Sequence, residues 1–109
     1  MTRSALGEFE HHVLLALVRL GGRAHAPPIV AELESATGKS ISPAAVFIAL
    51  RRLELRGYAK SSKREAKPGQ GGPGRRTFQV TALGHAKLRE ARRTFERLWG
   101  TSDPAAESS

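Results

Sequence analysis

The chain has 109 residues, no cysteine, 18 Lys+Arg against 10 Asp+Glu, and a formal charge of +8. Its length suits one compact domain and not two, and the missing cysteines exclude a disulfide framework and a thiolate zinc site. Residues 51–76 carry 9 basic and 2 acidic side chains, 9 − 2 = +7, so nearly all the excess charge lies in one window. Such a window is typical of a polyanion binder, although a solubilising face would look the same.

The first predicted element is a helix over 6–20, because apolar residues from Phe9 to Leu20 recur three or four apart before Gly21. Its longest apolar run, Val13 to Val18, has six residues, whereas about 20 are needed to cross a bilayer. The N-terminus also lacks a signal-peptide pattern. We therefore expect a soluble, cytoplasmic protein that does not contact membranes.

Two further helices follow. Pro27 and Pro28 suit the first turn of a helix that ends at Gly38. Ser42 is a good N-cap for a third helix over about 43–56, which Gly57 closes. The 100° periodicity turns Val46, Leu50 and Leu53 inward, and the opposite face presents Ala44, Ile48, Arg51, Arg52 and Leu55. Folding alone gives no reason for an exposed Ile48 on that face.

Two strands are predicted next, a weakly alternating one over 58–67 and a clearer one over 75–80. The segment KPGQGGPGRR at 67–76 has the composition of a hairpin tip. Its glycines match G-x-G-x-x-G, but the match neither follows a buried strand nor opens a helix, which argues against dinucleotide binding.

Thr81 is the predicted N-cap of a last helix over 82–99, whose first turn can dock on the domain through Leu83 and Ala86. An apolar stripe follows at spacings of three and four: Leu88, Ala91, Phe95, Leu98 and Trp99. Because little of the domain is left to cover this apolar stripe, we expect it to be a dimerisation surface. Folding back on the core of the same domain is the alternative. The tail, 101–109, is expected to be disordered.

Enzyme chemistry finds no support, since none of the four histidines has a chelating or catalytic spacing. We therefore predict that the protein is not an enzyme and has neither a metal site nor a cofactor. The order of three helices, a strand, a Gly-rich tip and a strand instead favours a helix-turn-helix with a wing on double-stranded DNA. The predicted recognition-helix contacts are Ser42, Ala44, Ala45, Phe47, Ile48, Arg51 and Arg52, and the wing contacts are Lys63, Arg64, Lys67, Arg75 and Arg76. A protein-interaction module that recruits a different partner through its last helix, with only non-specific nucleic-acid binding, remains the rival.

Three motifs, LGEFE at 6–10, SPAAVFIALRRLELRG at 42–57 and VTALG at 80–84, closely resemble the PadR-like family of bacterial transcriptional regulators. The resemblance covers about 6–99. It implies a mainly α fold with a small β-hairpin: a winged helix-turn-helix in 1–81 and a C-terminal dimerisation helix in 82–100.

The resemblance further implies a homodimeric repressor on palindromic operator DNA. Some relatives release DNA when a small aromatic inducer binds, and such a site, if present, is expected near Phe9 and Trp99. The family usually has tyrosine where this chain has Phe47. The hydroxyl that could bind a phosphate or a ligand is therefore missing.

Overall fold

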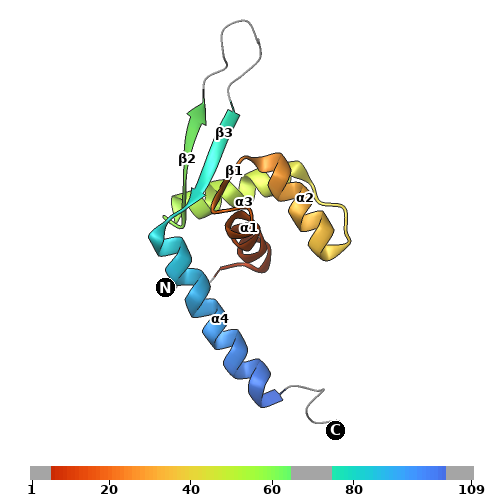
Figure 1. Cartoon of the computed structure of the whole chain (residues 1–109), viewed down its shortest axis with the longest axis vertical. Coiled ribbons are helices and arrows are strands. Elements are labelled where there is room, and N and C mark those ends of the chain that lie inside the picture. The colour runs from red at the N-terminus through yellow and green to blue at the C-terminus, as the bar shows by residue number, and fades with distance from the viewer. Residues whose placement is uncertain (1–5, 65–74, 103–109) are drawn as a thin grey trace, which may run out of the picture.

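The computed structural model describes residues 6–64 and 75–102. The elements in chain order are α1 (Glu8–Arg19), β1 (Arg23–Ala24), α2 (Ala26–Thr37), α3 (Pro43–Leu55), β2 (Ala59–Arg64), β3 (Arg75–Val80) and α4 (Ala82–Ser102) (Figure 1). The predicted mainly helical fold with a β-hairpin is confirmed. Residues 67–74 of the predicted hairpin tip, with Lys67, and residues 103–109 of the predicted disordered tail lie outside the described residues, whereas Arg75 and Arg76 begin β3.

The sheet contains one strand that the sequence did not predict. β3 is its central strand and pairs antiparallel with β2 on one side and with β1 on the other. β1 has only two residues, too few for an alternating pattern to be visible. The amide of Val80 donates to the carbonyl of Gly22 at 2.9 Å, which extends this junction beyond the ladder.

Backbone geometry agrees with glycine stops after the second and third predicted helices and with the predicted N-caps of the third and fourth. Gly38 and Gly57 have φ of 71° and 83°, the left-handed region that favours glycine after a helix. At α3, the Ser42 Oγ accepts from the amide of Ala45 at 3.2 Å. At α4, the Thr81 Oγ1 accepts from the amide of Gly84 at 3.0 Å. Both predicted N-caps therefore satisfy an amide that the helix itself leaves unpaired.

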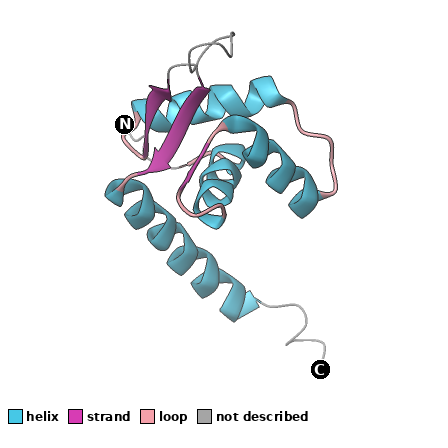
Figure 2. Cartoon of the chain, turned by 45° about the horizontal axis from the view of Figure 1, so that its top comes forward, coloured by secondary structure: helices cyan, strands magenta, loops and turns pink. Residues whose placement is uncertain are grey.

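The core lies where α1, α2, α3 and the sheet meet (Figure 2). Val46, Leu50 and Leu53 are buried, as the helical spacing of α3 predicts. They pack in one cluster with residues from the other elements: Val13, Leu14, Leu17, Ile29, Leu33, Phe78, Val80 and Leu88. Because α3 buries this face completely, its opposite face is held toward solvent.

The last helix docks with a different face from the predicted one. Leu83 is 55% exposed and Ala86 is exposed, whereas Gly84 and Leu88 are buried. Leu88 therefore belongs to the core of its own domain, and the exposed part of the apolar stripe begins after it. α4 also continues to Ser102, so the predicted tail starts later than residue 101. Figures 1 and 2 both show the C-terminal half of α4 extending away from the other elements.

No helix in the described part of the chain combines the length and the apolarity needed to span a bilayer.

Candidate nucleic-acid interface

The exposed face of α3 carries an outer crest formed by Ala44, Ile48 and Leu55, which share one direction at 100° per residue. Ile48 is 51% exposed and Leu55 is 84% exposed, as expected from the sequence. Ser42 is also exposed at the leading end of the helix, while Ala45 is half-buried. Small side chains at this end allow close approach to a groove, and a branched apolar side chain can meet a thymine methyl group.

Arg51 and Arg52 lie on opposite sides of the outer crest. The Arg51 Nη1 donates to the Glu54 Oε1 at 2.8 Å, on the side of the wing. The Arg52 Nη1 lies 3.9 Å from the Glu10 Oε2 of α1, and Glu10 also pairs with Arg56 at 3.3 Å. These two predicted contacts therefore flank the crest and do not form one cluster. Both guanidinium groups remain exposed, so their ion pairs do not prevent contact with a ligand.

The outer end of the β2–β3 hairpin opposes basic residues directly. The register places Lys63 opposite Arg76 and Arg64 opposite Arg75. Like charges in directly opposed positions destabilise a sheet. In the described residues, no carboxylate forms an ion pair with Lys63, Arg75 or Arg76. The opposed basic residues do not help the hairpin to fold, but they would stabilise a complex with an anionic partner.

A chain of hydrogen bonds connects the wing to α3. The Arg76 Nη1 donates to the Ser61 Oγ at 2.8 Å, and the Ser61 hydroxyl donates to the Glu54 Oε2 at 2.7 Å. Arg51 holds the other oxygen of the same carboxylate. Sequence reasoning missed Glu54 and Ser61. The spacing of Arg51 and Glu54 suggests their pairing, but the contact with Ser61 depends on how the strand packs against the helix.

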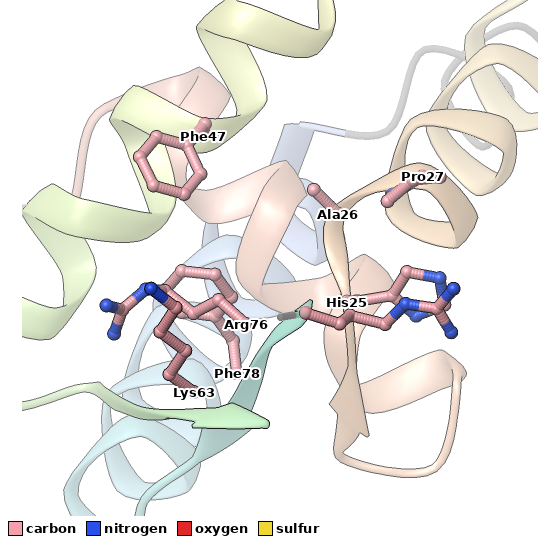
Figure 3. A pocket seen from close by; sticks show the side chains of 8 residues that line it. His25, Ala26, Pro27, Phe47, Lys63, Arg76 and Phe78 are labelled. Carbon is pink, nitrogen blue, oxygen red and sulfur yellow. The ribbon is translucent and has the colours of Figure 1, made fainter. Parts of the chain in front are cut away.

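Between α2, α3 and the hairpin lies a cavity of about 510 Å³, the wing-root pocket. Its lining consists of His25, Ala26, Pro27, Phe47, Lys63, Arg75, Arg76 and Phe78 (Figure 3). The Phe47 ring meets the Phe78 ring edge-on, with centroids 6.0 Å apart at 81°. Phe47, one of the predicted recognition-helix contacts, thus faces the wing and not the direction of the outer crest.

His25 is a member of the pocket that sequence reasoning did not select. It occupies the N-cap position of α2, but its side chain makes no capping hydrogen bond. Partial burial, and then the charge of Arg75, lower the pKa of His25 below its usual value. Both effects disfavour the protonated form of its imidazole.

A second surface lies on the far side of the winged helix, between α1 and α4. A cavity of about 720 Å³ is lined there by apolar side chains, among them Leu15, Leu88 and Phe95, together with ionisable side chains of α1 and α4. Beyond it, the Phe95 and Trp99 rings stack with centroids 6.1 Å apart at 16°. The exposed fractions of Phe95, Leu98 and Trp99 are 65%, 66% and 55%, and Ala91 is half-buried. Neither Phe9 nor Trp99, the expected neighbours of an inducer, lines this cavity.

The chain is similar to known proteins both in sequence and in structure. A model of the "Transcriptional regulator PadR-like family" matches residues 14–90. A PadR family transcriptional regulator from Eggerthella lenta has a similar structure, with TM-score 0.70 and 25% identity over 89% of this chain and 82% of that chain. No curated protein matches the sequence.

Two further solved structures share the fold. A PadR-like transcription factor from Bacteroides fragilis has TM-score 0.75 and 22% identity, over 87% of this chain and 86% of that chain. A winged-helix DNA-binding protein from STIV has TM-score 0.65 and 17% identity, over 87% of this chain and 95% of that chain. The β2–β3 hairpin therefore occupies the position of the wing in a winged-helix fold.

Proposed function

The chain belongs to the PadR-like family of transcriptional regulators, and on that premise we propose that it is a homodimeric repressor of palindromic operator DNA. It is a transcriptional regulator with a winged-helix DNA-binding fold and not an enzyme. The observation that carries the proposal is that α3, with its exposed outer crest, and the opposed cations of the wing border one pocket. A regulator acts where the DNA lies, so the proposal includes a cytoplasmic location.

The recognition helix in this proposal is α3. Ser42, Ala44, Ala45 and Ile48 enter the major groove, where the small residues admit the helix and Ile48 meets a thymine methyl group. Arg51 and Arg52 reach phosphates or guanine edges on either side of the crest. Phe47 contributes to the interface from the wing side of the helix.

The wing supplies sequence-independent affinity. The proposed phosphate contacts are Lys63, Arg64, Lys67, Arg75 and Arg76. Each neutralised phosphate releases condensed counterions, so these contacts would make the affinity strongly salt-dependent. The opposed pair Lys63 and Arg76, costly in the free protein, supports this role because a phosphate between them would remove their repulsion.

The dimer in this proposal forms through α4, with residues 82–100 as dimerisation helix and 1–81 as DNA-binding unit. The apolar stripe of one copy packs on that of another, which would cover Phe95, Leu98 and Trp99. Their exposure on a helix that extends from the domain supports this. A small aromatic inducer would, in this proposal, enter the cavity where α1 approaches α4, because the dimer would enclose it there.

The decisive experiment is selection of bound sequences from random or genomic DNA with the full chain. We expect an enriched palindrome whose half-sites are one helical turn apart, because two copies of α3 must enter successive major grooves. Transcription from a promoter that carries this sequence should fall when the protein is added. Enrichment of no sequence would contradict the proposal and favour the rival, an interaction module that binds DNA without sequence preference.

A further inference from the structure

The wing-root pocket combines basic and aromatic groups from four separate parts of the chain. His25 precedes α2, Phe47 belongs to α3, and Lys63 and Arg76 come from the two strands of the wing. Figure 3 shows Lys63 and Arg76 on one side of the pocket and His25 on the other, with Phe47 above. Four of the eight lining residues are basic and none is acidic. The pocket therefore favours an anion.

The position of Arg76 is fixed before any ligand binds. Ser61 accepts a hydrogen bond from its guanidinium, and Glu54 of α3 accepts one from Ser61. The bond to Ser61 uses one N–H of a group that has five, so most donors stay available. A held guanidinium loses less side-chain entropy on binding than a mobile one.

The aromatic floor distinguishes between anions. Phe78 is fully buried and its ring meets the Phe47 ring edge-on, so this part of the pocket lining is apolar. An inorganic ion gains nothing from such a surface, but a DNA backbone presents a deoxyribose beside each phosphate. The pocket also borders α3, whose outer crest would lie in the adjacent groove. One nucleotide of the backbone matches both the charges and the floor.

We propose that the wing-root pocket seats one backbone phosphate of DNA with its deoxyribose on Phe47, and that His25 completes the site by binding this phosphate as an imidazolium. This assignment rests on the function proposed above. His25 takes up a proton when the phosphate arrives, because the anion offsets the repulsion from Arg75. The ionisable groups of the described residues that face it from the wing, Lys63, Arg75 and Arg76, are all cations.

The lowered pKa of His25 fits a coupling between phosphate binding and proton uptake by this histidine. Burial and Arg75 lower it in the free protein, and a bound phosphate raises it. A group whose pKa rises on binding makes the complex tighter at low pH, and the gain is lost as the pH rises through the bound-state pKa. DNA affinity should therefore increase as the pH falls through the histidine range.

The test is fluorescence anisotropy of a labelled random-sequence duplex with the full chain, between about pH 6 and about pH 8. The wild-type protein should bind about fivefold tighter at the lower pH. His25→Ala should remove most of this dependence and lower the salt slope by about one. His25→Arg should bind tightly at both pH values, since its charge is fixed. His85→Ala, which removes an exposed imidazole from α4, is the matched control and should behave as wild type.

Two outcomes would overturn the inference. His25→Ala with wild-type affinity, salt slope and pH dependence would remove His25 from the site. Inorganic phosphate that raises the NMR-measured pKa of His25 as much as the duplex does would show a free phosphoryl site and not a DNA contact. If the wild-type protein bound neither random nor selected DNA, the proposed function would fail first.

Discussion

Gly84 of α4 lies against the backbone of Tyr58, and a Cβ added at Gly84 would be 2.2 Å from the Tyr58 carbonyl oxygen. The same Tyr58 carbonyl accepts from the amide of Thr81 at 3.1 Å. The Thr81 hydroxyl donates to the Gly57 carbonyl at 2.6 Å. This junction fixes where α4 leaves the winged helix, and it tolerates no side chain at Gly84.

Gly84→Ala should therefore destabilise the protein. We expect a loss of about 2 kcal/mol in the free energy of unfolding, because the backbone must shift to admit the methyl group. Gly100→Ala is the matched control on the same helix, since an added Cβ at Gly100 meets no atom within 4 Å. It should be neutral or slightly stabilising. Urea unfolding of both variants measures this, and equal midpoints would show that the junction can relax.

The wing should contribute affinity without sequence preference. Arg75→Ala/Arg76→Ala should weaken binding to every duplex and reduce the slope of log affinity against log salt by about two, as two phosphate contacts are lost. Arg93→Ala/Arg97→Ala removes the same charge from the α4 face opposite the apolar stripe and should leave the slope nearly unchanged. Gel-shift titrations at several salt concentrations measure both, and an unchanged slope in the wing variant would refute its phosphate contacts.

The apolar stripe should control the oligomeric state. We expect the wild-type protein to sediment as a dimer at micromolar concentration. Phe95→Ser/Trp99→Ser should weaken the dimer at least about 100-fold, because two large aromatic side chains would stay in water. Leu83→Ser is the control, as Leu83 is exposed to the same extent as Trp99 but faces the other side of α4. A wild-type monomer would count against the homodimer and favour a different partner for α4.

Protonation of His11 in α1 should destabilise the folded protein as the pH falls. Burial, and then the neighbouring His12, lower the pKa of His11 in the folded protein. The unfolded chain then binds more protons, so the stabilisation is present above the ordinary histidine pKa and is lost as the pH falls. The melting temperature should drop from about pH 7.5 to about pH 5.5, above the main carboxylate range, and drop less in His11→Gln. An equal drop in both proteins would exclude His11 as the cause.

Much of the fold was predictable because helical spacing reports directly on burial. In α3, Val46, Leu50 and Leu53 are buried and Ile48 is exposed, as the helical periodicity of 100° per residue predicts. The caps at Ser42 and Thr81 are local interactions between near neighbours in the chain, so their residue types predict them. Strand β1 gave no such signal because two residues cannot show a period.

The parts that were missed depend on contacts distant in sequence. Leu83 was expected in the core because it is apolar, but the hydrogen bonds of Thr81 to Gly57 and Tyr58 rotate α4 so that Gly84 faces inward. The wing-root pocket likewise needs the register that sets Lys63 beside Arg76 and the packing that brings Glu54 to Ser61. Local patterns contain neither the register nor this packing.

The length of α4 between the winged domain and the proposed dimer contact also determines how far apart the two DNA-binding units lie. In the proposed dimer, the separation of the two copies of α3 depends on where along α4 the helices meet. Moving that meeting point by one helical turn would displace each domain by about 5.4 Å, a noticeable fraction of the roughly 34 Å between half-sites. The position of the stacked pair Phe95 and Trp99 along α4 would then set the half-site spacing. Moving the pair by one helical turn would change the preferred operator spacing without altering any residue that contacts DNA.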